Sequence, residues 1–189
     1  VLVELRLEHP LVDVRVFAVR GLAAGSVNLF VVFAVMFSLF LVLVQYLQAV
    51  LGYSALKAAS GLLPMALIMM PLSTIAPTIA ERIGFRRTLV TGMLLLAGGL
   101  VLFATLADPD GGYLSVLPGI LVLGTGVGLA MSPSTAAITS SLPEEKQGVA
   151  SALNDTVREM GGAVGIALIG QLAQARPAPD EGLVLHLQR

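Results

Sequence analysis

Three glycines, Gly124, Gly126 and Gly128, alternate directly after the apolar run from Ile120 to Leu123. A glycine-rich turn between a strand and a helix can cradle nucleotide phosphates, because its backbone N–H groups approach the ligand closely. That chemistry needs the spacing G-x-G-x-x-G, and here the third glycine comes one position early. The glycines also lie in an uncharged segment that is too long for a strand. The pattern therefore disfavours a nucleotide cofactor.

No other set of side chains predicts catalysis. The two histidines, His9 and His186, lie far apart in the sequence and outside the apolar segments. The serines of residues 132–141 therefore have no histidine within those segments to act as their base. Cysteine is absent, which excludes thiol chemistry, disulfides and zinc fingers. We expect no enzyme, no cofactor and no metal site.

The composition predicts a membrane protein. Of the 189 residues, 56% are hydrophobic and 12% are charged, and the mean hydropathy is +0.90. A soluble domain carries about 25% charged residues, which it needs to cover its core. The net charge of −1 offers no basic field that would attract nucleic acid. The expected surroundings are a lipid bilayer, with no nucleic-acid partner.

Long intervals without charge divide the chain into spans. A helix needs about 20 apolar residues to cross about 30 Å of hydrocarbon. The intervals predict an all-α membrane bundle, residues 24–173, with a segment 1–23 before it and a polar tail 174–189 after it. The five expected spans are about 24–47, 59–80, 88–107, 114–137 and 150–173.

Basic residues predict the orientation of the bundle. Lys and Arg in short loops are retained on the cytoplasmic side of a membrane. Residues 1–20 and residues 81–87 each contain three arginines, and these and Lys146 fall on one side if the spans alternate, whereas residues 107–112 contain two aspartates and no basic residue. We expect the N-terminal segment to be cytoplasmic in a multi-pass protein of the plasma membrane.

In lipid, glycines favour close helix packing. Gly124 and Gly128 are four residues apart on one helix face, and small residues let membrane helices approach closely. Gly161 and Gly165 repeat this spacing in the fifth span. We expect both pairs to lie in helix contacts. The alternative is that glycine is simply frequent in membrane helices.

Side chains of the first span are candidates for a substrate path. Uncharged polar groups in a span face protein or a water-filled cavity, because lipid cannot satisfy them. They therefore line the path or bond to a neighbouring helix. The three amides of this span are Asn28, Gln45 and Gln48, of which the last two are about one turn apart. Its phenylalanines face either the cavity or lipid.

Charged side chains near span ends are candidates for gating. Glu81, Arg86 and Arg87 form either a cytoplasmic charge latch or a topology signal alone. Asp155 and Arg158 are three residues apart and can pair on a helix. This pair either lowers the cost of helix entry or lets Arg158 bond a neighbouring helix end at an inner gate.

Several motifs resemble the C-terminal half of a major facilitator superfamily transporter, more narrowly the fourteen-span drug:proton antiporter branch. PLVDVRVF (10–17) is similar to the segment before a span, and ERIGFRR (81–87) resembles the basic cytoplasmic loop. The most specific match is LPEEKQGVASALNDTVREMGGAVGIAL (142–168), which follows P-x-x-x-x-G-x-A-S-x-x-N-x-x-x-R-x-x-G-G-A-x-G. In the basic loop, Glu81 replaces the usual Asp and Pro77 the usual Gly.

The resemblance implies a transporter fragment that exports drugs or other lipophilic small molecules by proton-coupled alternating access. It implies that an N-terminal half and one last span are missing. The middles of the spans contain no Asp, Glu or His, so the coupling carboxylate is expected in that missing half. The alternatives are a carrier for a metabolite or sugar, or a non-transporting membrane scaffold or sensor segment.

Overall fold

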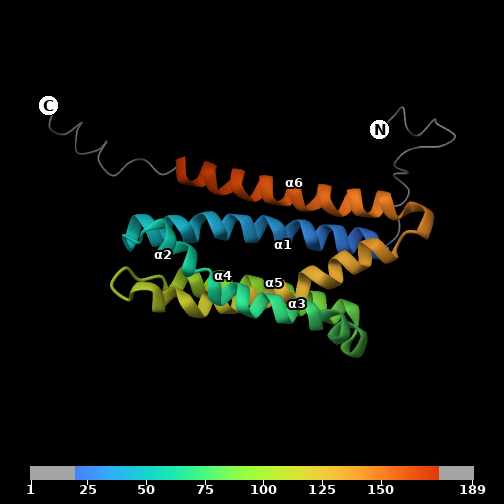
Figure 1. Ribbon diagram of the computed structural model, residues 1–189, viewed down its shortest axis with the longest axis horizontal. Helices are drawn as coiled ribbons and strands as arrows, with labels where there is room; N and C mark the ends of the chain where they lie inside the picture. The colour runs from blue at the N-terminus through green and yellow to red at the C-terminus, as the bar shows by residue number, and fades with distance from the viewer. Residues whose placement is uncertain (1–19, 175–189) are drawn as a thin grey trace.

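The computed structural model describes residues 20–174, and the expectations for residues 1–19 and 175–189 lie outside this part. The described residues form helices and contain no strand, which confirms the all-α fold class (Figure 1). In chain order these elements are α1 (Arg20–Gln45), η3 (Tyr46–Val50), α2 (Ala55–Ser60), α3 (Leu63–Ile83), α4 (Phe85–Leu106), α5 (Gly112–Ser140), η4 (Glu144–Lys146) and α6 (Gln147–Gln174).

Within residues 20–174, four helical stretches are long and apolar enough to cross a membrane. They are Gly21–Val50, Ala55–Ile83, Phe85–Leu106 and Gly112–Ser140. The fifth long helix, α6, has 28 residues, but the charges of Asp155, Arg158 and Glu159 in its first half make it less apolar. The described part is therefore a multi-span helical bundle.

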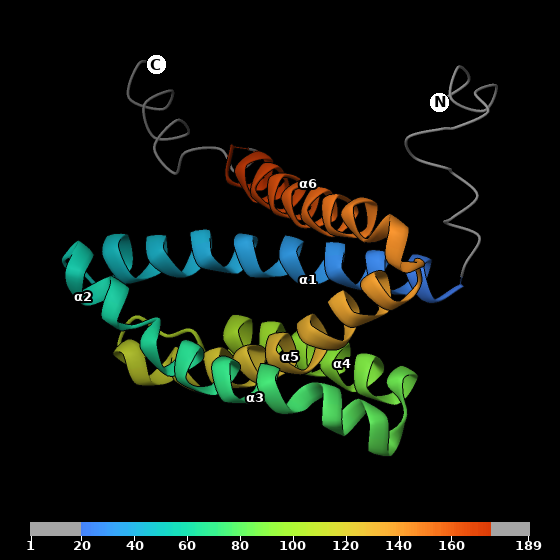
Figure 2. The same cartoon turned by 45° about the vertical axis from the view of Figure 1, so that its right-hand side comes forward.

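Helix α5 is the centre of the bundle. It packs against α4, α3 and α1, whereas α6 packs mainly along α1. Figure 2 shows this division, with α1 and α6 side by side and α3, α4 and α5 grouped together. Half of the membrane-length segment of α5 is buried within the bundle. Helix α5 thus holds α1, α3 and α4 in place, and α1 in turn holds α6.

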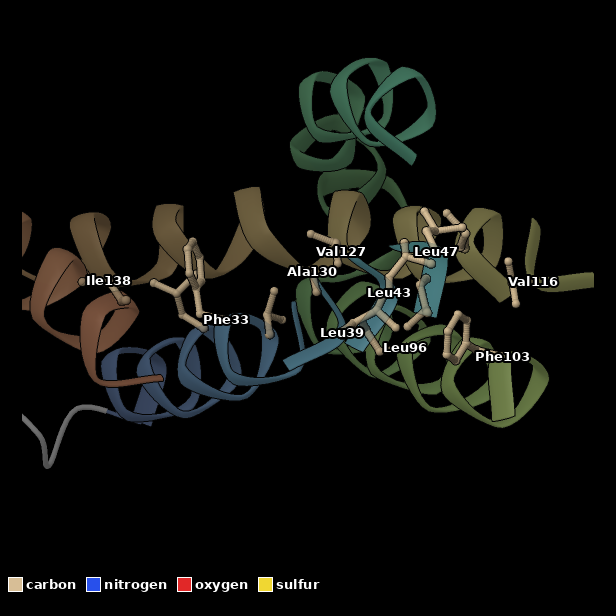
Figure 3. Close-up of a cluster of buried hydrophobic side chains, with 14 of the residues drawn as sticks. Phe33, Leu39, Leu43, Leu47, Leu96, Phe103, Val116, Val127, Ala130 and Ile138 are labelled. Atoms are coloured by element: carbon tan, nitrogen blue, oxygen red, sulfur yellow. The ribbon is translucent and has the colours of Figure 1, made fainter. Parts of the chain in front are cut away.

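A buried apolar cluster joins α1 to α4 and α5 (Figure 3). Leu39, Leu43 and Leu47 follow one another at intervals of four residues, and all three are buried in this cluster. Phe103 of α4 belongs to the same cluster and lies edge-on to Tyr46, with 6.2 Å between the ring centroids. Because lipid is as apolar as these side chains, dispersion contact stabilises this cluster more than exclusion of water does.

Glycines on both helices allow the backbones of α4 and α5 to approach closely. A Cβ atom at Gly126 would lie 2.7 Å from the backbone nitrogen of Leu96, and one at Gly119 would lie 2.7 Å from that of Phe103. A larger side chain at either position would force the helices apart. The middle glycine of the 124–128 motif therefore faces α4.

Candidate functional site

An apolar groove opens between α1 and α3. Its volume is about 380 Å³, and every side chain that lines it is apolar. Methionines contribute much of the α3 wall, and their unbranched side chains adapt to ligands of different shape. The lining residues are Met36, Phe37, Leu39, Phe40 and Leu43 of α1, Leu62 directly before α3, and Met65, Ala66 and Met69 of α3. Two phenylalanines of the first helix thus face a groove.

A polar groove adjoins the apolar groove, since Met69 lines both. Its volume is about 500 Å³, and it lies among α3, α5 and α6. The lining residues are Met69, Met70 and Ser73 of α3, Met131, Ser132, Thr135, Ala136 and Thr139 of α5, and Arg158 of α6. Together the two grooves offer an apolar surface beside hydroxyl groups and one guanidinium.

Arg158 is the charged side chain of the polar groove. Its guanidinium lies 4.6 Å from the centroid of the buried Phe33 ring on α1, within the range of a cation–π contact. Its Nη1 atom lies 4.0 Å from Oδ1 of Asp155, one turn earlier on α6. Asp155 is 68% exposed, so water screens this ion pair and weakens it. Packing on Phe33 does more to hold Arg158 than the carboxylate does.

The amides of the first span lie in different surroundings. Asn28 is buried, and its Nδ2 donates to Oγ of Ser134 on α5 over 2.5 Å. It therefore bonds a neighbouring helix and lines neither groove. Gln45 and Gln48 are exposed and line neither groove, and the π-helical turn η3 begins between them.

The charges of the α3–α4 corner are exposed around Gly84, whose φ of 97° favours glycine. Glu81, Arg86 and Arg87 form no salt bridge within residues 20–174, where the Asp155–Arg158 pair is the only one. Their surroundings are compatible with a latch and with a topology signal.

The two glycine pairs serve different helix contacts. A Cβ at Gly124 would lie 3.1 Å from the carbonyl oxygen of Met65 on α3, and one at Gly128 would lie 3.1 Å from that of Met69. A Cβ at Gly161 would lie 2.5 Å from the carbonyl oxygen of Phe30 on α1. Gly165 packs in the same way on Ala34.

Sequence reasoning missed the hydroxyl row on α5. Ser132, Thr135 and Thr139 line the polar groove, where their hydroxyls can bind a ligand without acting as nucleophiles. Their spacing of three and four residues puts them on one face of a helix, and this periodicity is the signal that could have revealed them.

A multi-span helical bundle with adjoining apolar and polar grooves defines a membrane protein suited to small-molecule ligands. The profile of the Major Facilitator Superfamily matches residues 5–166. The chain belongs to this family, which confirms the resemblance seen in the sequence.

Curated relatives include proteins named for drug resistance and export. The chain is 33% identical over 88% of its length to the Multidrug resistance protein B homolog of Mycobacterium tuberculosis (strain ATCC 25618 / H37Rv), and covers 31% of that protein. It is 29% identical over 93% of its length to Multidrug transporter protein MdtP of Bacillus subtilis (strain 168), covering 32% of it. It is 34% identical over 98% of its length to the Tetracenomycin C resistance and export protein of Streptomyces glaucescens, covering 35% of it. The chain thus spans about a third of the length of these relatives.

Proposed function

We propose that this chain forms one wall of the substrate path in a transporter that exports drugs or other lipophilic small molecules. The observation that carries the proposal is the wholly apolar groove between α1 and α3, which adjoins the polar groove. Relatives named for multidrug resistance and for export support the same function. The protein acts as a carrier and not as an enzyme.

The lining of the apolar groove favours a lipophilic substrate over a sugar. A sugar site must replace the hydration of many hydroxyl groups, which requires several convergent polar side chains. The groove offers methionine, phenylalanine, leucine and alanine instead. A lipophilic molecule needs no such replacement, because removing its apolar surface from water is favourable.

Transport proceeds by alternating access, in which two halves rock around a site between them. The chain matches about a third of the length of its relatives. We propose that spans equivalent to the remaining part of the relatives supply the complementary half. We assign the proton-coupling carboxylate to that half, because no Asp or Glu lines either groove among the described residues. Residues 1–20 and 81–87 face the cytoplasm, and residues 107–112 face outwards at the plasma membrane.

A reconstituted efflux assay tests this function. Residues 1–189, co-expressed with complementary N-terminal spans and a last span, are expected to export a lipophilic dye but not a labelled sugar. Export should collapse when the proton gradient is dissipated. Sugar transport would contradict the proposal. Gradient-driven dye export by residues 1–189 alone would overturn the location of the proton site.

A further inference from the structure

The polar groove is asymmetric in its charge. Arg158 lines it, and no carboxylate does so among residues 20–174. Asp155, the acid nearest to Arg158, points largely to the exterior and is not part of the lining. A cationic group in this groove would therefore face the positive charge of Arg158, which the exposed Asp155 offsets only in part, whereas an anionic group would be attracted.

Arg158 also has donors to spare. The 4.0 Å separation from Asp155 is too long for a hydrogen bond, so this contact leaves the five guanidinium N–H groups unsatisfied. Phe33 is only 5% exposed, and its ring forms a packed platform under the guanidinium. Arginine held in one orientation suits bidentate recognition of oxyanions, whether planar carboxylates or tetrahedral groups such as phosphate and sulfonate.

Two hydroxyls on α5 complement Arg158. Ser132 and Thr135 are three residues apart, line the groove and are half-buried. Nearby hydroxyls are engaged, since Ser73 donates to the carbonyl of Met70 and Thr139 to that of Thr135. Within residues 20–174, by contrast, the structure has no hydrogen bond from the hydroxyls of Ser132 and Thr135, which leaves them free for a ligand.

We propose that Arg158, Ser132 and Thr135 form a subsite that binds an anionic or hydrogen-bond-accepting group of a lipophilic substrate. The apolar body of that substrate lies in the adjoining groove, on the far side of Met69. The subsite selects lipophilic acids and acceptor-rich neutral compounds and disfavours lipophilic cations. This inference rests on the proposed export function, because it takes the grooves as the path of the exported molecule.

Equilibrium binding of two matched fluorescent probes tests the subsite. Anilinonaphthalene sulfonate and phenylnaphthylamine share an aromatic frame, and only the former carries an anionic group. The chain is placed in nanodiscs of zwitterionic lipid, and the signal of empty nanodiscs is subtracted. We expect the wild-type chain to bind the sulfonate more tightly than the neutral probe.

Variants then identify the residues responsible. Arg158→Gln is expected to weaken sulfonate binding by about tenfold or more, because a charge-assisted hydrogen bond is lost, and to leave phenylnaphthylamine binding unchanged. Arg158→Lys should fall between wild type and Arg158→Gln, since it keeps the charge but loses the planar fork. Ser132→Ala and Thr135→Val should each weaken sulfonate binding by about threefold. Lys146→Gln, which removes one positive charge from the exposed turn η4, is the matched control and should change neither affinity.

Three results would overturn the subsite. The first is equal affinity of the wild-type chain for both probes, and the second is no binding of either probe. The third is an equal loss of affinity for both probes in Arg158→Gln, which would indicate a purely structural arginine. The assay needs no gradient and no transport. Failed export with an intact preference for the sulfonate would therefore refute the proposed function alone, and normal export without that preference would refute the subsite alone.

Discussion

At the residue scale, the hydrogen bond between Asn28 and Ser134 links α1 to α5 inside the bundle. Ser134 itself donates to the carbonyl of Ala130, so its oxygen is free to accept from the amide. Interhelical hydrogen bonds of this kind contribute about 0.6 to 2 kcal/mol in membranes. Asn28→Ala should lower the free energy of unfolding in detergent by an amount in this range.

A double-mutant cycle separates this bond from other effects of the substitution. The double variant Asn28→Ala with Ser134→Ala should cost less than the sum of the two single variants, because the shared bond is lost only once. Strictly additive losses would mean that the two side chains do not stabilise each other.

At the element scale, α6 is held on α1 by small residues. Any side chain at Gly161 or Gly165, even that of alanine, would meet the backbone of α1. At Gly170, on the same helix, a Cβ atom would have no neighbour within 4 Å. Gly161→Ala and Gly165→Ala should therefore destabilise the bundle by about 1–3 kcal/mol, as overpacking does. Thermal unfolding in detergent measures this effect.

Gly170→Ala is the matched control for that experiment. It should be neutral or slightly stabilising, because alanine favours the helix over glycine and meets nothing at this position. A second comparison is available on α4, where Gly99 packs against Leu123 while its neighbour Gly98 has open space. Equal effects at packed and open glycines would show that these helix contacts do not form.

The helical bundle was predictable from the sequence because lipid leaves the backbone few choices. Only helices and closed barrels satisfy every backbone polar group within a membrane, so long uncharged intervals indicate helices. The partners of each helix face were not predictable. The period of 3.6 residues gives the face on which Gly124 and Gly128 lie, but not that this face meets α3, or that Gly126 meets α4.

The candidate site was less predictable, because its residues come together only through tertiary packing. The partner of Asn28 lies 106 residues away in the sequence, and no local pattern links the two. A shared face for Gln45 and Gln48 presumes a regular α-helix, and the π-helical turn η3 alters the number of residues per turn at that point. The platform under Arg158 comes from Phe33, on a helix that is distant in sequence.

At the scale of the whole molecule, the orientation in the membrane decides which end of the grooves faces the cytoplasm. Basic residues at 81–87 and the acidic loop at 107–112 lie at opposite ends of α4. Since cysteine is absent, single cysteines can be introduced without background labelling. Ile83 and Asp110 are suitable positions, because both are exposed and neither is a glycine with positive φ.

In intact cells, Ile83→Cys should be protected from a membrane-impermeant thiol reagent and Asp110→Cys should react, because positive charge is retained inside. After the cells are opened, both should react, which shows that protection came from the membrane and not from burial. Labelling of Ile83→Cys but not Asp110→Cys in intact cells would invert the topology, and the two ends of the bundle would then face the opposite sides of the membrane.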